Sequence, residues 1–337
     1  MAVNQSQQAV AAKIRARYGR FLTEKDYLTL AQSGGVSDIL SYLVNHGPYG
    51  FQVPASSVSM QMTPIQPLLT QQYYEDLDNL LRFDCFLGSD LYRIVTEEVT
   101  VDLILDFCRH CNADTLSEFS PKLPPFLEQH LDFPLQALTE LQNYSQLISF
   151  LSSHPYADAI NACLPKPSEP INLTKLEYHL LTCYYTRLFR RMEDNPTQYR
   201  NTKELFSIKV DVENLQKLLR CQQYWKQDDC PDFLAFGTIP TKKLKEWFSL
   251  SQSKTLENIK ATPYGKQLSD HLPADVAFGY ILIYRCHQKI RMLQEIPALL
   301  VTYMILSRYQ IQCIVTIAEG VRYGMTSDAI TKLLPPM

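Results

Sequence analysis

The chain has 337 residues, of which 46% are hydrophobic and 20% are charged, so it can bury two or three large cores. Its net charge of −3 excludes the clustered basic excess that is typical of nucleic-acid-binding proteins. Only eleven glycines are present, and the absence of a Walker-type phosphate loop and of a G-x-G-x-x-G pattern argues against a nucleotide-binding fold.

Apolar residues recur at the helical period almost throughout, whereas the alternating runs typical of β-strands are nearly absent. In the first third we predict helices that end at residue 18 and that cover residues 24–31, 37–45, 69–81 and 101–111. In the middle third we predict helices within residues 135–151, 173–192 and 212–224. In the last third we predict helices at residues 241–248, 255–261, 274–292, 298–323 and 327–334. The predicted fold class is therefore all-α.

The dipeptide Pro-Tyr recurs at Pro48-Tyr49, Pro155-Tyr156 and Pro263-Tyr264, at steps of 107 and 108 residues. Each copy follows a short amphipathic run that reads as a helix end, which a proline cannot extend. Residues 18–50 and 236–265 also begin and end alike, while the middle copy is more divergent. We interpret the pattern as triplication of one helical unit, with repeats at residues 1–112, 113–225 and 226–337.

The nine cysteines and the first residues of the chain bear on its location. Residues 1–8 lack the apolar core of a signal peptide, so we expect reduced thiols in the cytosol. No apolar stretch reaches the roughly 18 residues needed to cross a bilayer. The longest candidate, residues 296–306, contains Pro297 and is followed by Arg308, and we interpret it as a buried helix.

Cys108 and Cys111 have the spacing of half a zinc site. No second Cys-x-x-Cys pair occurs, so we expect these cysteines to pack as small apolar groups in a helix. No cysteine lies in a recognisable nucleophile motif, and His46 and His154, close before Pro-Tyr dipeptides, are expected to satisfy helix-end carbonyls. We therefore predict no catalytic residue, no metal and no cofactor.

Clustered charges complete the set of candidate sites. The acidic pairs Glu97-Glu98 and Asp228-Asp229 fall in polar stretches and are interpreted as solvated surface. Two basic clusters are expected to make protein–protein contacts or helix-terminal ion pairs rather than to bind nucleic acid: Arg15, Arg17 and Arg20, and Arg187, Arg190 and Arg191. Within the second cluster, the spacing of four puts Arg187 and Arg191 on one helix face.

Several segments, in order along the whole chain, resemble a family of V-type ATPase central-stalk subunits, which are named C in prokaryotes and d in eukaryotes. They are KIRARYGRFLT at residues 13–23, YLVNHGPYG at 42–50, DVENLQKLLR at 211–220, and the end of the chain from 311 to 325. The sequence departs from the family where its last helix commonly shows Glu-x-x-Asn, because residues 310–313 here are Gln-Ile-Gln-Cys.

This resemblance implies a funnel of three similar helical bundles around a pseudo-three-fold axis. It implies a cytoplasmic, non-catalytic subunit that sits on the membrane rotor ring, receives the tip of the central shaft and couples ATP hydrolysis or synthesis to ion transport. It implies neither a membrane span nor nucleic-acid binding. Because the Pro-Tyr dipeptides hold equivalent positions, we predict that Tyr49, Tyr156 and Tyr264 lie on one rim that contacts a partner.

Two alternatives remain open. One is a generic α-helical scaffold or adaptor with no rotary role, which would be recovered with unrelated partners. The other is a metal- or thiol-dependent enzyme, which predicts bound zinc or an activity that is lost on Cys111→Ser.

Overall fold

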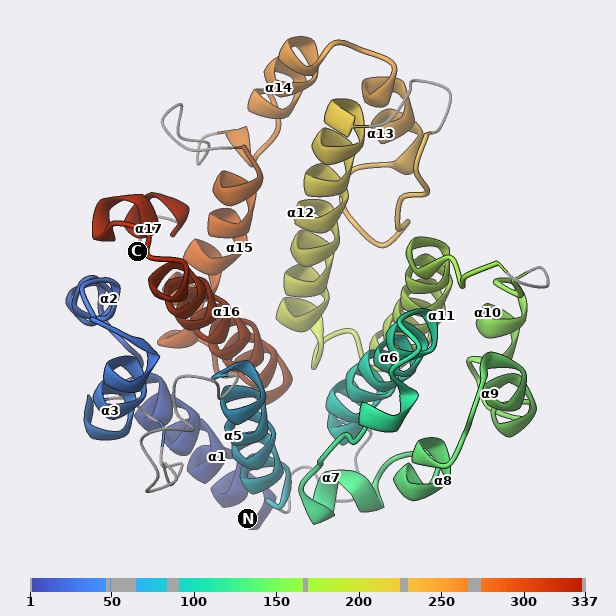
Figure 1. Ribbon diagram of the computed structural model, residues 1–337, viewed down its shortest axis with the longest axis horizontal. Helices are drawn as coiled ribbons and strands as arrows, with labels where there is room; N and C mark the ends of the chain where they lie inside the picture. The colour runs from blue at the N-terminus through green and yellow to red at the C-terminus, as the bar shows by residue number, and fades with distance from the viewer. Residues whose placement is uncertain are drawn as a thin grey trace.

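The computed structural model describes residues 2–46, 49, 65–83, 91–165, 169–224, 230–265 and 274–334. All regular structure within these ranges is helical, which confirms the predicted all-α class (Figure 1). The first third contains α1 (Ala2–Tyr18), α2 (Glu24–Ala31), α3 (Val36–His46), α5 (Ile65–Leu81) and α6 (Leu91–Asn112).

The middle third has several short elements before two long helices. They are η1 (Leu116–Glu118), α7 (Pro125–Gln129), α8 (Leu135–Thr139), α9 (Tyr144–Phe150), α10 (Ala157–Asn161), α11 (Leu173–Asp194) and α12 (Arg200–Tyr224). The last third contains α13 (Thr241–Phe248), α14 (Gln252–Lys260), α15 (Ala274–Ile290), α16 (Ile296–Arg322) and α17 (Ser327–Leu333).

The predicted helices at residues 24–31 and 241–248 agree with α2 and α13 to the residue. By contrast, α6 and α12 begin at Leu91 and Arg200, well before the predicted starts at residues 101 and 212. The early turns of both helices carry charged residues that interrupt the apolar period. One of these, Glu97, is only 3% exposed, so the interpretation of Glu97-Glu98 as solvated surface is wrong. The second acidic pair, Asp228-Asp229, lies outside the described residues.

The order of elements recurs along the chain. In each third, two shorter helices precede a Pro-Tyr dipeptide and two long helices follow it: α2 and α3 before α5 and α6, α8 and α9 before α11 and α12, and α13 and α14 before α15 and α16. Pro134 and Pro240 stand directly before the first short helix of the second and third sets, where a proline is compatible with a helix start. The boundaries of the three repeats stay a prediction.

Packing joins each third to the last long helix of another third. Helix α6 packs against α11, α12 packs against α15, and α16 packs against α1, α2 and α5. Figure 1 shows the result as three groups of helices, with α6 beside α7–α11, α12 beside α13–α15, and α16 beside the N-terminal helices. The last long helix thus returns to the first ones, and the packing crosses the predicted boundaries after residues 112 and 225.

Helix α16 connects the two hydrophobic cores of the molecule. Its first half lies in the large core that runs from Val10 to Leu306, and its second half packs with α2, α3 and α17 in a smaller core. By length and composition, α16 is the one helix of the described residues that could cross a membrane. This corrects the sequence-based statement that no such stretch exists. Most of its apolar window is buried in the protein, as predicted for residues 296–306.

Gly237 offers a test of how closely the last third packs on α12. A Cβ atom at Gly237 would lie 2.0 Å from Oδ1 of Asp211, so we expect Gly237→Ala to lower the free energy of unfolding by about 1–3 kcal/mol. Urea denaturation measures this change.

Gly279→Ala in α15 is the matched control, because its Cβ would meet only Nε2 of Gln216 at 3.8 Å. Here we expect no loss, or a gain of up to about 1 kcal/mol from helix propensity. Equal losses at the two positions would contradict the packing described.

Candidate functional site

One long helix from each third meets the other two near the centre of the molecule, and charged side chains join them. Glu98 of α6 accepts hydrogen bonds from Nζ of Lys209 on α12, at 3.3 Å, and from Nη1 of Arg308 on α16, at 2.8 Å. Arg308 also binds Asp102, one turn after Glu98, at 2.9 Å, and Lys209 lies 3.8 Å from Glu213. We call these five residues the central charge cluster.

The two cations of the cluster determine how its carboxyl groups titrate. Burial alone would raise the pKa of Glu98, but Arg308 and Lys209 outweigh it and hold that pKa below its usual value. Burial raises the pKa of Asp102 and of Glu213 despite the same cations, and the charge of Glu98 adds to both shifts. Glu98 is therefore the carboxylate that both cations stabilise, while its acidic neighbours repel it.

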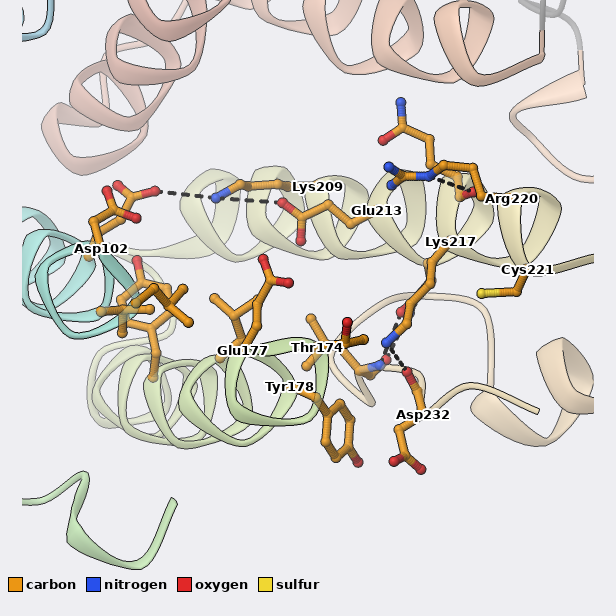
Figure 2. Close-up of a pocket in the computed structure, with 18 of the residues that line it drawn as sticks. Asp102, Thr174, Glu177, Tyr178, Lys209, Glu213, Lys217, Arg220, Cys221 and Asp232 are labelled. Atoms are coloured by element: carbon orange, nitrogen blue, oxygen red, sulfur yellow. Dashed lines mark hydrogen bonds and ion pairs between the residues drawn. The ribbon is translucent and has the colours of Figure 1, made fainter. Parts of the chain in front are cut away.

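The central charge cluster faces open space. A cavity of about 550 Å³ lies between α6, α11 and α12, and Figure 2 shows Glu177, Lys209, Glu213 and Lys217 on its walls. A second cavity of about 270 Å³, between α12, α15 and α16, shares four residues of the cluster: Glu98, Lys209, Glu213 and Arg308. The cluster is only partly enclosed by protein: the side chains of Glu98 and Arg308 are 13% and 35% exposed, and those of Glu213 and Asp102 are 38% and 45% exposed.

Asp211 and Asn214 of α12 form hydrogen bonds with the chain that follows this helix. Asp211 accepts hydrogen bonds from the backbone N–H groups of Thr238 and Ile239, at 2.9 and 3.0 Å, and from the hydroxyl of Tyr264, at 2.6 Å. Asn214 exchanges two hydrogen bonds with the backbone of Leu234, at 2.9 and 3.0 Å. This segment of the chain is therefore positioned by α12.

Gln310 of α16 forms similar hydrogen bonds with residues of the first third. Its Oε1 accepts a hydrogen bond from the N–H of Leu22, and its Nε2 donates to the hydroxyl of Tyr49, both at 2.7 Å. An amide can accept and donate at once, whereas Asp211 only accepts. Although Gln310 departs from the Glu-x-x-Asn pattern of the family, its side chain binds the tyrosine of one Pro-Tyr dipeptide.

The structure places all three Pro-Tyr tyrosines in the interior, where Tyr49, Tyr156 and Tyr264 are 6%, 1% and 7% exposed. It does not bring their rings together, because each packs within a different helix group. Tyr156 stacks on His154, and its buried hydroxyl has no hydrogen-bond partner among the described residues. In this structure the rings pack inside the protein, and a partner contact at these turns stays a prediction.

The basic clusters make internal contacts. Arg187 and Arg191 both donate to Oε1 of the buried Glu97, which confirms that they share a helix face. Arg17 forms an ion pair with Asp76 at 2.6 Å, as expected for such a cluster. In the same clusters, Arg15 binds the carbonyl of Leu293, and Arg20 and Arg190 are exposed.

The candidate thiols are in apolar surroundings. Cys108 is fully buried, and burial raises its pKa strongly and that of Cys111 to about 11. Such thiols are protonated at neutral pH and are poor nucleophiles and metal ligands. Across the described ranges, no group of three or more His, Cys, Asp or Glu side chains has the arrangement of a metal site.

The two histidines differ in role. Nδ1 of His46 lies 3.3 Å from the carbonyl of Tyr42, which agrees with the predicted contact at a helix end. His154 does not satisfy a carbonyl: its Nδ1 accepts from the N–H of Tyr156 at 3.4 Å, and its Nε2 lies 3.8 Å from Asp132. That prediction was wrong because the chain turns back at Pro155 and brings its own next N–H to the ring.

The family model described as ATP synthase (C/AC39) subunit matches residues 10–333. The chain belongs to this family. It is also 27% identical, over 279 residues, to a Methanosphaera stadtmanae protein that is named as the C subunit of an A-type ATP synthase. That alignment covers 78% of this chain and 67% of the relative. The resemblance found in the sequence is thereby confirmed at the level of the family.

Sequence reasoning missed the central charge cluster. A usable signal was present, because Glu98 and Asp102, and likewise Lys209 and Glu213, are four residues apart and share a helix face. Adjacent acids such as Glu97 and Glu98 point in different directions on a helix, so only one of them reaches the cluster. The sequence could not show which helices would bring opposite charges to that face.

The tyrosine hydroxyls provide a matched pair of variants. Tyr264→Phe removes a donor from the buried Asp211, so we expect the free energy of unfolding to fall by about 1–2 kcal/mol. Tyr156→Phe removes a hydroxyl without a hydrogen bond and should have little effect or stabilise slightly. Urea denaturation of both variants decides the point, and an equal loss in the two would refute these assignments.

Glu98→Gln tests the cluster through its pH dependence. The pKa of Glu98 is lower in the folded state than in the unfolded state, so the ionised carboxylate stabilises the folded protein. This stabilisation is fully present above the unfolded-state pKa of about 4.3 and is lost as the pH falls through the folded-state pKa. We expect the variant to be less stable by about 1–3 kcal/mol at pH 7, with the difference shrinking in acid.

Chemical denaturation at several pH values measures this difference, with the exposed Glu257→Gln as the control. A difference from the wild type that does not change between pH 7 and pH 3 would exclude the ionised Glu98 as its cause.

Proposed function

We propose that this protein is the non-catalytic central-stalk subunit of an A/V-type rotary ATPase, coupling the central shaft to the membrane rotor ring. In this role it lies on the cytoplasmic side, peripheral to the membrane, and transmits torque between ATP hydrolysis or synthesis and ion transport. The observation that carries the proposal is the family match over residues 10–333. The relative from an A-type ATP synthase supports the same class of complex.

The packing of the chain is suited to a mechanical role. A coupler must resist deformation, and close-packed helical interiors have low compressibility. Helix α16 packs against α1, α2 and α5, so the last third is fixed to the first through a buried interface. Torque applied to one helix group is therefore carried to the others through packed side chains and through the central charge cluster.

We further propose that the three repeats, at residues 1–112, 113–225 and 226–337, form a funnel around a pseudo-three-fold axis. Two observations support it: the recurring order of short and long helices, and the parallel hydrogen bonds of Tyr49 with Gln310 and of Tyr264 with Asp211. The shaft would enter at the centre, where the cavities lie. The Pro-Tyr turns would form equivalent positions of one rim.

Omission of this protein from a reconstituted ATPase tests the proposal. We expect ATP hydrolysis by the catalytic head to continue while ion transport falls to background, because the shaft is no longer joined to the ring. Adding back the purified full chain should restore transport, and a heat-denatured sample is the control.

Unchanged ion transport in the absence of the chain would overturn the proposal. Recovery of the chain with proteins other than those of the shaft and the ring would favour the scaffold alternative.

A further inference from the structure

The cavity of about 550 Å³ contains a carboxylate that forms no ion pair with a described residue. Glu177 of α11 lines this cavity and is exposed, and Lys217, a cation of the cavity within electrostatic range of it, forms no ion pair with it. Figure 2 shows its carboxylate directed toward that of Glu213, which projects from α12 on the opposite wall. Two like charges thus face each other across open space.

The four cations that line the cavity contact groups other than Glu177, and Nε of Arg220 donates to the backbone carbonyl of Gln216 at 3.4 Å. Lys209 and Arg308 are shared among Glu98, Asp102 and Glu213. Lys217, the next cation along α12, donates to the carbonyl of Asp232 at 2.7 Å, away from Glu177 in Figure 2. The part of the cavity around the cluster therefore has four carboxylates, Glu98, Asp102, Glu177 and Glu213, and two cations, while Asp232, Lys217 and Arg220 line the rest of the cavity.

A buried hydroxyl on the same wall also lacks a partner. Tyr184 of α11 lines the cavity and is 1% exposed, and its hydroxyl makes no hydrogen bond with any described residue. Tyr184 lies within electrostatic range of Glu98 and Lys209. Burial raises the pKa of Glu213, Lys209 opposes the shift, and the charges of Glu98 and Glu177 add to it. A bound cation would relieve the repulsion between Glu177 and Glu213.

We propose that the cavity between α11 and α12 receives an arginine or lysine side chain of the inserted shaft protein, and that Glu177 and Glu213 bind it. The inference rests on the proposed function, which supplies a partner at the centre of the molecule. It adds the chemistry of recognition: a basic group of the partner pairs with carboxylates contributed by two different helices. Charge complementarity at this one point determines how the partner is oriented.

One other cavity differs in chemistry, which would favour one orientation of the partner. The cavity of about 400 Å³ beside α2 and α15 is lined by aromatic side chains, including Phe21, Tyr27, Tyr280 and Tyr284. A partner with one basic and one apolar side would therefore fit better in one orientation, even inside a funnel with pseudo-three-fold symmetry.

Calorimetric titration of the purified shaft protein of the same ATPase into the full chain tests the proposal. We expect Glu177→Gln combined with Glu213→Gln to weaken binding about tenfold or more and to flatten its salt dependence. The control combines Glu246→Gln and Glu257→Gln, which remove the same charge from exposed positions on α13 and α14 and should leave the affinity unchanged.

The outcomes are distinguishable. Equal affinity of the wild type and the cavity variant overturns this inference while the proposed function stands, because the shaft still binds. Failure of the shaft to bind the wild type overturns both. Thermal denaturation shows whether the double variant is folded. If it is not, the single variant Glu177→Gln is used in its place, because Glu177 has no internal ion pair to lose.

Discussion

A single carboxylate, that of Glu98, joins the last long helices of the three parts of the chain. It lies on α6 and binds Lys209 of α12 and Arg308 of α16. Burying charges costs solvation energy, so such a cluster adds little net stability compared with an apolar contact. The cluster instead affects how the helices are arranged. If α6, α12 or α16 shifts, a charge is left without its partner in a partly buried site. The geometry of the centre is therefore strongly specified.

The remaining architecture follows from how the long helices are distributed. Each of them packs against helices from a different third, so the three groups are linked through buried interfaces and not only through the backbone. Hydrogen bonds from Asp211 and Gln310 also link separate parts of the chain. Each of these side chains binds a backbone N–H and a tyrosine hydroxyl that are distant in sequence. A molecule linked in this way transmits force without separating into independent domains, which is what a mechanical coupler needs.

The sequence predicted the helices wherever apolar residues kept their period, as in α2 and α13, and the order of its motifs identified the family. It failed where polar residues are buried. The start of α6 was missed and Glu97 was assigned to the surface, because its partners Arg187 and Arg191 are about 90 residues away. Glu98, Lys209 and Arg308 were missed for the same reason. Helical periodicity is a local property, whereas the pairing of buried charges depends on the tertiary fold.

The most direct measurement of this account is a double-mutant cycle between Glu98 and Arg308, using Glu98→Gln and Arg308→Met in urea denaturation. If the carboxylate holds α16 to α6, the two changes will be non-additive, with a coupling energy of about 1–3 kcal/mol. Additive effects, with a coupling energy within about 0.3 kcal/mol of zero, would show that the central charge cluster does not fix the helices and would contradict the account.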